Sequence, residues 1–554
     1  MLLSRNKVRL AAFGLIGMVG ATASFPSIAQ EARPATPERP EATRIGEAAK
    51  TDAGQSLGVA PQAAASGDRL PTESRTSHAL ASGDRTLRFI ATAGALPITN
   101  SQGRVLAEIA YTAYVLDAVE SQKRPVTFAF NGGPGSASTW LHLGAFGPWR
   151  MPLTMETARP SATPTLLPNA DSWLDFTDLV FIDPVGTGYS HIVNETSSSG
   201  AQGPGSGGRG ANREVGGPGW FWSVGGDVES ISDFILSWLT RNDRLASPKM
   251  IAGESYGGFR GPRIAQFLQR QRGVGINAMV LISPVLDFAY RRGGHQPLYF
   301  AGLLPSLGAA ALERKGEVPS RTALQSVEDY ARGEFLLDLM RGPRDSAAVE
   351  RVVVRVAAIS GLPSDTVRRY GGRFGGAAYV REVYGPSRRV ASFYDVSMTG
   401  FDPYPTAPGS RFDDPFVTGI EAPMTSAMRE HYRRLGWHVG RPYVIASDEA
   451  TSGWIWGNSA NAPESVSSIG EVLALDPRFR LLVTHGFTDT ITPYLASQLL
   501  LEQLPDYGEP NRVTLNVYAG GHMHYSRDAT RAALHADAAA LLVEALREPA
   551  RPER

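Results

Sequence analysis

Hydrophobic residues along the chain gather in short runs that are typical of buried strands. We expect strands at 86–92, 105–116, 125–130, 179–182, 249–252, 278–282, 480–484 and 513–518. Apolar residues recur at helical spacing after Asp227, and two further helices are expected at 262–269 and 529–546. Strands that alternate with helices indicate an α/β fold with a mostly parallel central sheet flanked by helices on both faces.

The N-terminal segment 1–29 has the pattern of a secretory signal peptide. Basic Arg5, Lys7 and Arg9 precede a short apolar run, and small residues then lead to a cleavage site expected near Ala29. A membrane-spanning helix needs about 20 apolar residues, so this run is short for a permanent anchor. We therefore expect an exported protein, periplasmic or extracellular, with no membrane span after cleavage.

Composition divides the remaining chain. An Ala- and Pro-rich stretch at 30–85 is expected to be a disordered linker, and a Gly- and Ser-rich stretch at 196–219 a flexible loop. The predicted core comprises 86–289 and 443–548. Between them, 290–442 lacks buried-strand runs and is expected to be a helical cap insertion.

Charge and cysteine content narrow the chemistry. The 554 residues include 54 Lys plus Arg and 54 Asp plus Glu, so a basic surface for nucleic acid is not expected. The chain has no cysteine, which excludes disulfides, thiol nucleophiles and thiolate metal sites. Catalysis would have to use hydroxyl, carboxylate, imidazole or amine groups.

The sequence Gly253-Glu254-Ser255-Tyr256-Gly257 follows an expected strand and precedes an expected helix. This is the setting of a nucleophile elbow in the α/β-hydrolase fold, where glycines let a serine occupy a sharp strand-to-helix turn. The start of the helix would also favour negative charge developing near the serine. Ser255 is therefore the candidate nucleophile.

The fold requires an acid and then a histidine downstream of the nucleophile. Asp489 follows the strand expected at 480–484, and His522 follows the strand expected at 513–518. Both lie in loops at strand ends, where such a sheet places its active site. His524 and His485 are competing bases; His522 is favoured because two glycines precede it.

An oxyanion hole would need two backbone N–H groups. The residue after the nucleophile, Tyr256, supplies one. The Gly-rich loop after the strand at 125–130 would supply the other through Gly133.

Several motifs together resemble the serine carboxypeptidase family of the carboxypeptidase Y type. Besides the elbow and the Asp489 and His522 loops, they are NGGPGS at 131–136, GAFGP at 144–148, NADSW at 169–173 and FIDPVGTGYS at 181–190. They follow the family's order across roughly 126–525.

The resemblance implies hydrolysis of the C-terminal peptide bond of peptides by a Ser255–His522–Asp489 triad. It also implies that Asn131 and Glu254 bind the substrate's free C-terminal carboxylate, with no metal or organic cofactor. Two carboxylates in contact must share a proton, so Glu254 would have to be protonated.

Some positions depart from the family pattern. Many members carry a second glutamate where Ala145 stands and a tryptophan where Ala129 stands, as well as disulfides. The loss of a partner carboxyl at Ala145 removes one cause of a raised pKa at Glu254.

Two alternative functions follow from the same residues. An esterase or acyltransferase on this fold would use the same acyl-enzyme, although Asn131 and Glu254 favour a substrate with a free carboxylate. A non-catalytic exported binding protein is disfavoured by the presence of Ser255, Asp489 and His522 together.

Overall fold

The computed structural model describes residues 69–82, 85–117, 122–193, 217–291, 295–407, 412–457 and 461–547. Within these ranges, a ten-stranded sheet has the order β1-β2-β3-β7-β4-β9-β10-β13-β14, with β8 paired to β3. The strands from β7 to β14 in this order are parallel, and β1, β2 and β3 add an antiparallel edge. The predicted α/β-hydrolase fold is confirmed.

The strands of this sheet have the following bounds: β1 Ser74–Ser82, β2 Arg85–Thr99, β3 Val105–Leu116, β4 Val126–Phe130, β7 Asp178–Ile182, β8 His191–Ile192, β9 Lys249–Glu254, β10 Ala278–Ile282, β13 Arg480–Gly486 and β14 Val513–Tyr518. Two short hairpins pair β5 (Trp149–Arg150) with β6 (Leu167–Pro168), and β11 (Arg389–Ala391) with β12 (Thr399–Phe401).

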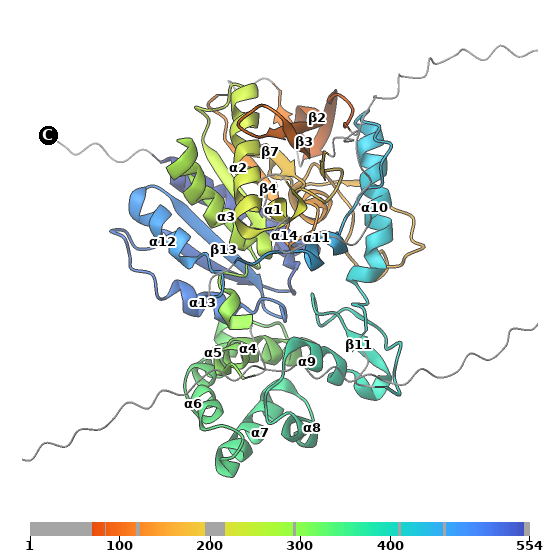
Figure 1. Ribbon diagram of the computed structural model, residues 1–554. Helices are drawn as coiled ribbons and strands as arrows, with labels where there is room; N and C mark the ends of the chain where they lie inside the picture. Colours follow the sequence, from red (N-terminus) through yellow and green to blue (C-terminus); the bar gives the residue numbers. More distant parts are fainter. Residues whose placement is uncertain are drawn as a thin grey trace, which may run out of the picture. The chain divides into compact units, whose positions relative to one another are not determined.

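Helices cover both faces of the sheet because successive strand residues point to opposite sides. On one face, Phe128 and Ile251 pack with α2 (Val224–Arg241), α3 (Tyr256–Phe267) and α12 (Val466–Leu475). On the other face, Ala252 and Val280 belong to a cluster that includes α14 (Asp528–Leu546), the π-helical segment η1 (Trp140–Phe146) and α10 (Val417–Arg434). Helices α2 and α3 lie next to each other over the sheet (Figure 1).

The remaining helices are α1 (Pro218–Phe221), α4 (Pro297–Arg314), α5 (Arg321–Arg332), α6 (Glu334–Arg341), α7 (Ser346–Ser360), α8 (Ser364–Arg369), α9 (Gly376–Glu382), α11 (Asp448–Ser452) and α13 (Tyr494–Leu501). Short helical turns lie at η2 (Trp173–Asp175), η4 (Leu268–Arg272), η5 (Phe288–Arg291), η6 (Gly385–Ser387) and η7 (His524–Ser526). In the part of the chain described, no helix is long and apolar enough to cross a membrane.

The start of α3 differs from its prediction. The expected helix at 262–269 begins six residues earlier, at Tyr256, because glycines there allow the helix to pack tightly on the sheet. A Cβ at Gly257 would lie 2.7 Å from the carbonyl oxygen of Phe130, so a side chain at this position would displace β4. The glycines after Tyr256, which in the sequence suggest a loop, therefore form the first turn of α3.

The linker prediction is wrong at its C-terminal end. β1 lies inside the expected linker at 30–85 and pairs along its whole length with β2. Its polar residues alternate with few apolar ones, as suits an edge strand with one solvated face, so it lacks the hydrophobic run of a buried strand. The segments 1–29 and 30–68, and most of the loop expected at 196–219, lie outside the described residues.

The segment at 290–442 divides into two parts. Its first helices, α4 to α9, lie together (Figure 1) and bury a separate apolar cluster around Leu303, Phe335 and Val353. By contrast, α10 packs Ile420 and Met424 into the cluster on the sheet. The insertion therefore ends by returning to the core.

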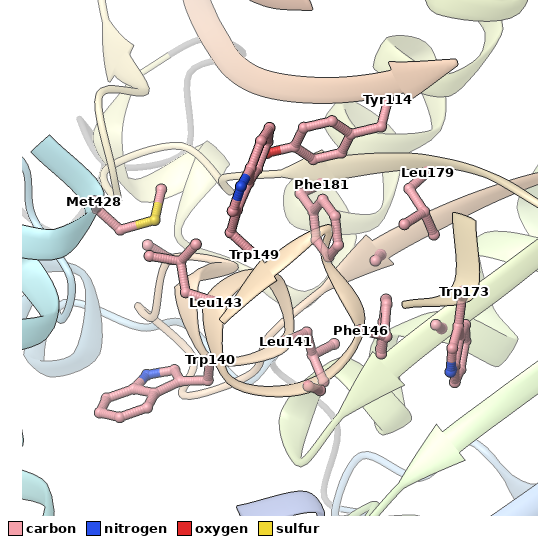
Figure 2. Packing of buried hydrophobic residues seen from close by; sticks show 14 of the residues in the cluster. Tyr114, Trp140, Leu141, Leu143, Phe146, Trp149, Trp173, Leu179, Phe181 and Met428 are labelled. Atoms are coloured by element: carbon pink, nitrogen blue, oxygen red, sulfur yellow. The ribbon is translucent and has the colours of Figure 1, made fainter. Parts of the chain in front are cut away.

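A buried polar trio lies in that core cluster. The Tyr114 hydroxyl lies 2.6 Å from Nε2 of both His142 and His431. Trp149 and Phe181 surround it, with Met428 of α10 nearby (Figure 2). Burial, aided by the charge of Arg434, lowers the pKa of His431 to about 3; burial also lowers the pKa of His142 well below its usual value. Both imidazoles are therefore neutral in the folded protein at ordinary pH.

This trio predicts a loss of stability in acid. In the unfolded chain His431 binds a proton near pH 6.5, but in the folded protein it stays neutral to about pH 3, so stability falls as pH decreases between these values. We expect His431→Gln to flatten the dependence of unfolding free energy on pH by about 1 kcal/mol per pH unit between about pH 6 and 4. Chemical denaturation at several pH values measures this, and His438→Gln, at an exposed position near the end of α10, is the control. Equal slopes for the two variants would contradict the assignment.

Candidate active site

Ser255 lies on a strained turn between β9 and α3. Its φ of 60° and ψ of −119° fall outside the regions that residues with a side chain normally adopt. Backbone hydrogen bonds hold the turn: Ser255 N donates to the carbonyl of Ile282 at 2.9 Å, and Ser255 O accepts from Gly258 N at 3.0 Å and Val285 N at 3.2 Å. This is the strand-to-helix geometry that presents a serine at the carboxyl edge of a parallel sheet.

The loop after β4 lies directly against this turn. β4 and β9 are parallel neighbours, with Phe130 opposite Gly253. A Cβ on Gly132 would collide with Tyr256 N and would lie 2.7 Å from the carbonyl oxygen of Glu254, so only glycine permits this approach. Gly133, the next residue, adopts a φ of +101°. The two predicted oxyanion donors, the N–H groups of Gly133 and Tyr256, thus belong to loops in direct backbone contact.

A buried ion pair ties both loops to α2. Arg260 is completely buried. It donates a hydrogen bond from Nη1 to the carbonyl of Asn131 at 2.9 Å and another from Nε to the Asp227 carboxylate at 2.7 Å. Its guanidinium also lies 5.0 Å from the centroid of the Tyr256 ring. One charged side chain therefore contacts both segments that carry the predicted oxyanion donors.

Asp489 and His522 meet at the ends of β13 and β14. His522 Nδ1 lies 2.9 Å from Asp489 Oδ2, and both side chains are buried. Asp489 Oδ1 accepts the backbone N–H groups of Ile491 at 2.8 Å and Thr492 at 2.9 Å. Burial opposes ionisation of Asp489, but His522, His485 and the backbone N–H of Thr492 outweigh it and hold the pKa of Asp489 below the usual value. Asp489 is thus suited to orient the imidazole and to stabilise its cation.

Thr492 and Ser283 link the acid, the base and the sheet. The Thr492 hydroxyl lies 2.7 Å from Asp489 Oδ2, 3.0 Å from His522 Nδ1 and 2.9 Å from the carbonyl oxygen of Ser283. The Ser283 hydroxyl in turn donates to the carbonyl of His522 at 2.7 Å. Sequence analysis did not identify either residue, because a lone threonine or serine after a strand carries no distinguishing pattern.

The insertion also reaches this loop. His522 N donates to the carbonyl of Tyr394 at 2.5 Å, and the Tyr394 ring lies edge-on to the imidazole at 5.3 Å. Arg527, five residues after His522, bonds Asp395 at 3.0 Å and Glu313 at 2.7 Å. The segment at 290–442 therefore helps to fix the position of the imidazole.

The competing histidines have other surroundings. His524 Nε2 lies 3.1 Å from the Thr484 hydroxyl, and burial lowers its pKa to about 3. Burial lowers the pKa of His485 to about 4. The hydrogen bond to Asp489 belongs to His522, so the geometry favours His522 as the base.

Beside Ser255, the residue Glu254 is buried, with 3% of its surface exposed. Its Oε2 accepts from Asn131 Nδ2 at 2.5 Å and from the Tyr525 hydroxyl at 2.8 Å. Burial raises the pKa of Glu254 to about 7; His522, Tyr525 and Asn131 act against this rise, and Asp489 adds to it. A carboxyl with such a pKa is protonated in mild acid and can donate a hydrogen bond to an anionic ligand.

Tyr525 was not identified by sequence analysis. It comes within the same loop as His522 and is fully buried, whereas its partner Glu254 lies 271 positions earlier. Ala145, which stands where many family members are expected to carry a second glutamate, is also fully buried, and its carbonyl accepts from Asn169 Nδ2 at 2.9 Å. Hydrogen bonds to Glu254 thus come from an amide and a phenol.

Comparisons with known proteins find similarity in the part of the chain that contains Asn131, Glu254 and Ser255. Residues 89–301 match the family model described as serine carboxypeptidase. Serine carboxypeptidase-like 36 of Arabidopsis thaliana is 26% identical over 212 residues, 36% of each chain. Pheromone-processing carboxypeptidase KEX1 of Pyricularia oryzae is 37% identical over 79 residues, 14% of this chain and 11% of that protein. The matched stretches span about a third or less of these curated relatives.

Among solved structures, the prohormone-processing carboxypeptidase KEX1(delta)P of Saccharomyces cerevisiae is similar to this chain with a TM-score of 0.49 and 14% identity. The alignment covers 81% of this chain and 90% of that one.

The contacts of Thr492 predict a role in the reactivity of Ser255. Thr492→Val removes the hydroxyl but keeps the backbone N–H group that binds Asp489, so the imidazole loses one of its supports. We expect labelling of Ser255 by a fluorophosphonate to slow by about tenfold. Thr490→Val is the matched control, since the Thr490 hydroxyl bonds the carbonyl of Phe393 at 2.8 Å. Equal labelling rates for the two variants would contradict this role.

Proposed function

We propose that the chain hydrolyses the C-terminal peptide bond of peptides through an acyl-enzyme on Ser255, as its match to the serine carboxypeptidase family model over residues 89–301 suggests. The single observation that carries this proposal is the buried, protonatable Glu254 carboxyl next to the nucleophile. A general esterase needs no such group, whereas an enzyme that selects a free C-terminus needs a donor for its carboxylate.

In the acylation step, Ser255 Oγ attacks the carbonyl carbon of the last peptide bond as His522 takes the hydroxyl proton. Asp489, bonded to His522 Nδ1, keeps the imidazole in the tautomer whose Nε2 accepts that proton. The oxyanion receives hydrogen bonds from the N–H groups of Gly133 and Tyr256. His522 then protonates the departing amine, and the C-terminal amino acid leaves.

In the deacylation step, a water molecule takes the place of the amine. His522 accepts a proton from this water, the water oxygen attacks the acyl-enzyme, and Ser255 regains its proton as the shortened peptide leaves. Transfer of the same acyl group to an alcohol or amine would use identical residues, which is why peptide and ester substrates must be compared directly.

Recognition of the substrate would depend on Asn131 and Glu254. Asn131 Oδ1 accepts the N–H of Leu141 at 3.0 Å, which fixes the amide so that Nδ2 faces Glu254. Nδ2 has a second hydrogen that can be donated to the substrate carboxylate. The protonated Glu254 would supply the other donor.

The proposed setting is outside the cytoplasm, in the periplasm or the medium. The basic and apolar pattern of residues 1–29 supports export, and the proposed partners are peptides with a free C-terminus.

The proposal predicts removal of single residues from the free end of a peptide. A peptide with a blocked N-terminus is incubated with the protein, with either a free or an amidated C-terminus, and the products are measured by mass spectrometry. We expect trimming of the free form only, and none by Ser255→Ala. An intact free peptide, together with fluorophosphonate labelling of Ser255 and ester hydrolysis, would contradict peptidase activity and favour the esterase.

A second prediction concerns pH. The substrate carboxylate binds the protonated form of Glu254, and this form is lost as pH rises through about 7. We expect kcat/KM for a free-carboxylate peptide to fall by about tenfold per pH unit above that value. An ester without a carboxylate should keep its rate there, and Glu254→Gln should remove the fall because an amide does not titrate. A fall of the same size with both substrates would contradict this assignment.

A further inference from the structure

Both hydrogen bonds that the described residues make to the Glu254 carboxyl go to one oxygen. Asn131 Nδ2 lies 2.5 Å and the Tyr525 hydroxyl 2.8 Å from Oε2. A carbonyl-type oxygen has two lone pairs, so these two donors occupy its accepting capacity. The remaining oxygen, Oε1, is then the site for a proton.

The direction of the Tyr525 hydrogen bond follows from its burial. Tyr525 is fully buried, and in the described part of the chain its hydroxyl has Glu254 Oε2 as its hydrogen-bond partner. If a proton on Oε2 were donated to Tyr525, the phenolic hydrogen would be left without an acceptor, at a cost of about 1–3 kcal/mol. Tyr525 therefore donates to Glu254.

Neighbouring groups hold this arrangement in place. The Asn131 amide cannot flip, because Oδ1 accepts from Leu141 N. The Tyr525 ring packs beside Gly144, where a Cβ would lie 3.3 Å from Cε2 of the ring. The titratable groups that act on Glu254 are His522, Asp489 and Tyr525.

We propose that Tyr525 is a positioning residue for recognition of the substrate's C-terminal carboxylate: with Asn131 it occupies Oε2 of Glu254, so that the Glu254 proton lies on Oε1 and is donated to the substrate. This inference rests on the proposed carboxypeptidase function and assigns to a phenol the task of orienting the protonated carboxyl. Tyr525 acts through Glu254 and does not take part in the acyl transfer.

The test compares Tyr525→Phe with Tyr518→Phe, in which a tyrosine at the end of β14 loses its hydroxyl bond to Asp537. For a free-carboxylate peptide, we expect Tyr525→Phe to raise KM about five- to tenfold with little change in kcat. The alkaline limb of kcat/KM should move to higher pH, because Glu254 loses a donor that stabilises its charged form. Hydrolysis of an ester without a carboxylate should stay unchanged, and Tyr518→Phe should shift neither quantity.

A double substitution separates positioning from a structural effect. In a Glu254→Ala background, Tyr525→Phe should cause no further rise in KM, since its partner is absent. A rise of the same size in both backgrounds, or an equal loss on peptide and ester, would overturn the proposal.

Glu254→Gln tests the same idea without altering Tyr525. Its amide oxygen can accept from both Tyr525 and Asn131, which directs the NH₂ group toward the substrate, so KM near pH 5 should stay close to that of the wild type. Glu254→Leu should lose this binding. Equal KM values for these two variants would overturn the inference.

These outcomes distinguish the inference from the function on which it rests. If the wild type trims peptides while Tyr525→Phe keeps its KM and its alkaline limb, the inference alone fails. If the wild type hydrolyses esters but no peptide, both fail.

Discussion

Backbone contact between the loops after β4 and β9 is the constraint on which the site depends. These parallel strands lie side by side at the point where the order of the strands across the sheet reverses, which is where open α/β sheets place their ligand sites. The loops touch so closely that Gly132 and Gly257 have no room for a side chain. Ser255, Glu254 and the two predicted oxyanion donors therefore lie on two segments that are in direct backbone contact.

This proximity also affects the pKa values of the two carboxyl groups in the site, Asp489 and Glu254. Asp489 and Glu254 are both buried near His522, yet their pKa values move in opposite directions. Asp489 accepts two backbone N–H groups and the imidazole, and it stays charged. Among the described residues, Glu254 accepts hydrogen bonds only from an amide and a phenol, so burial dominates and its proton is kept to about pH 7. Two carboxyls in one site can thus serve as orienting anion and neutral donor.

The sequence predicts the parts of the molecule that have a local pattern. The sequence locates fully apolar strands such as β4 and β10 within a residue of their bounds. Position after an expected strand, together with chain order, makes Asp489 and His522 the candidate partners of Ser255. β1 was missed because an edge strand needs no continuous apolar run. Tyr525 was missed for a different reason: its contact with Glu254 exists only once β9 and the loop after β14 meet in space.

The most direct test of this account counts protons on binding. Ser255→Ala cannot form the acyl-enzyme, so its complex with a peptide can be studied by titration calorimetry in buffers of different ionisation enthalpy. If Glu254 must be protonated to hold the substrate carboxylate, a free C-terminus should bind with uptake of nearly one proton at about pH 8 and almost none at about pH 5. The amidated peptide should bind weakly and without this uptake. Equal affinity for both peptides, or binding at about pH 8 with no proton uptake, would contradict the account.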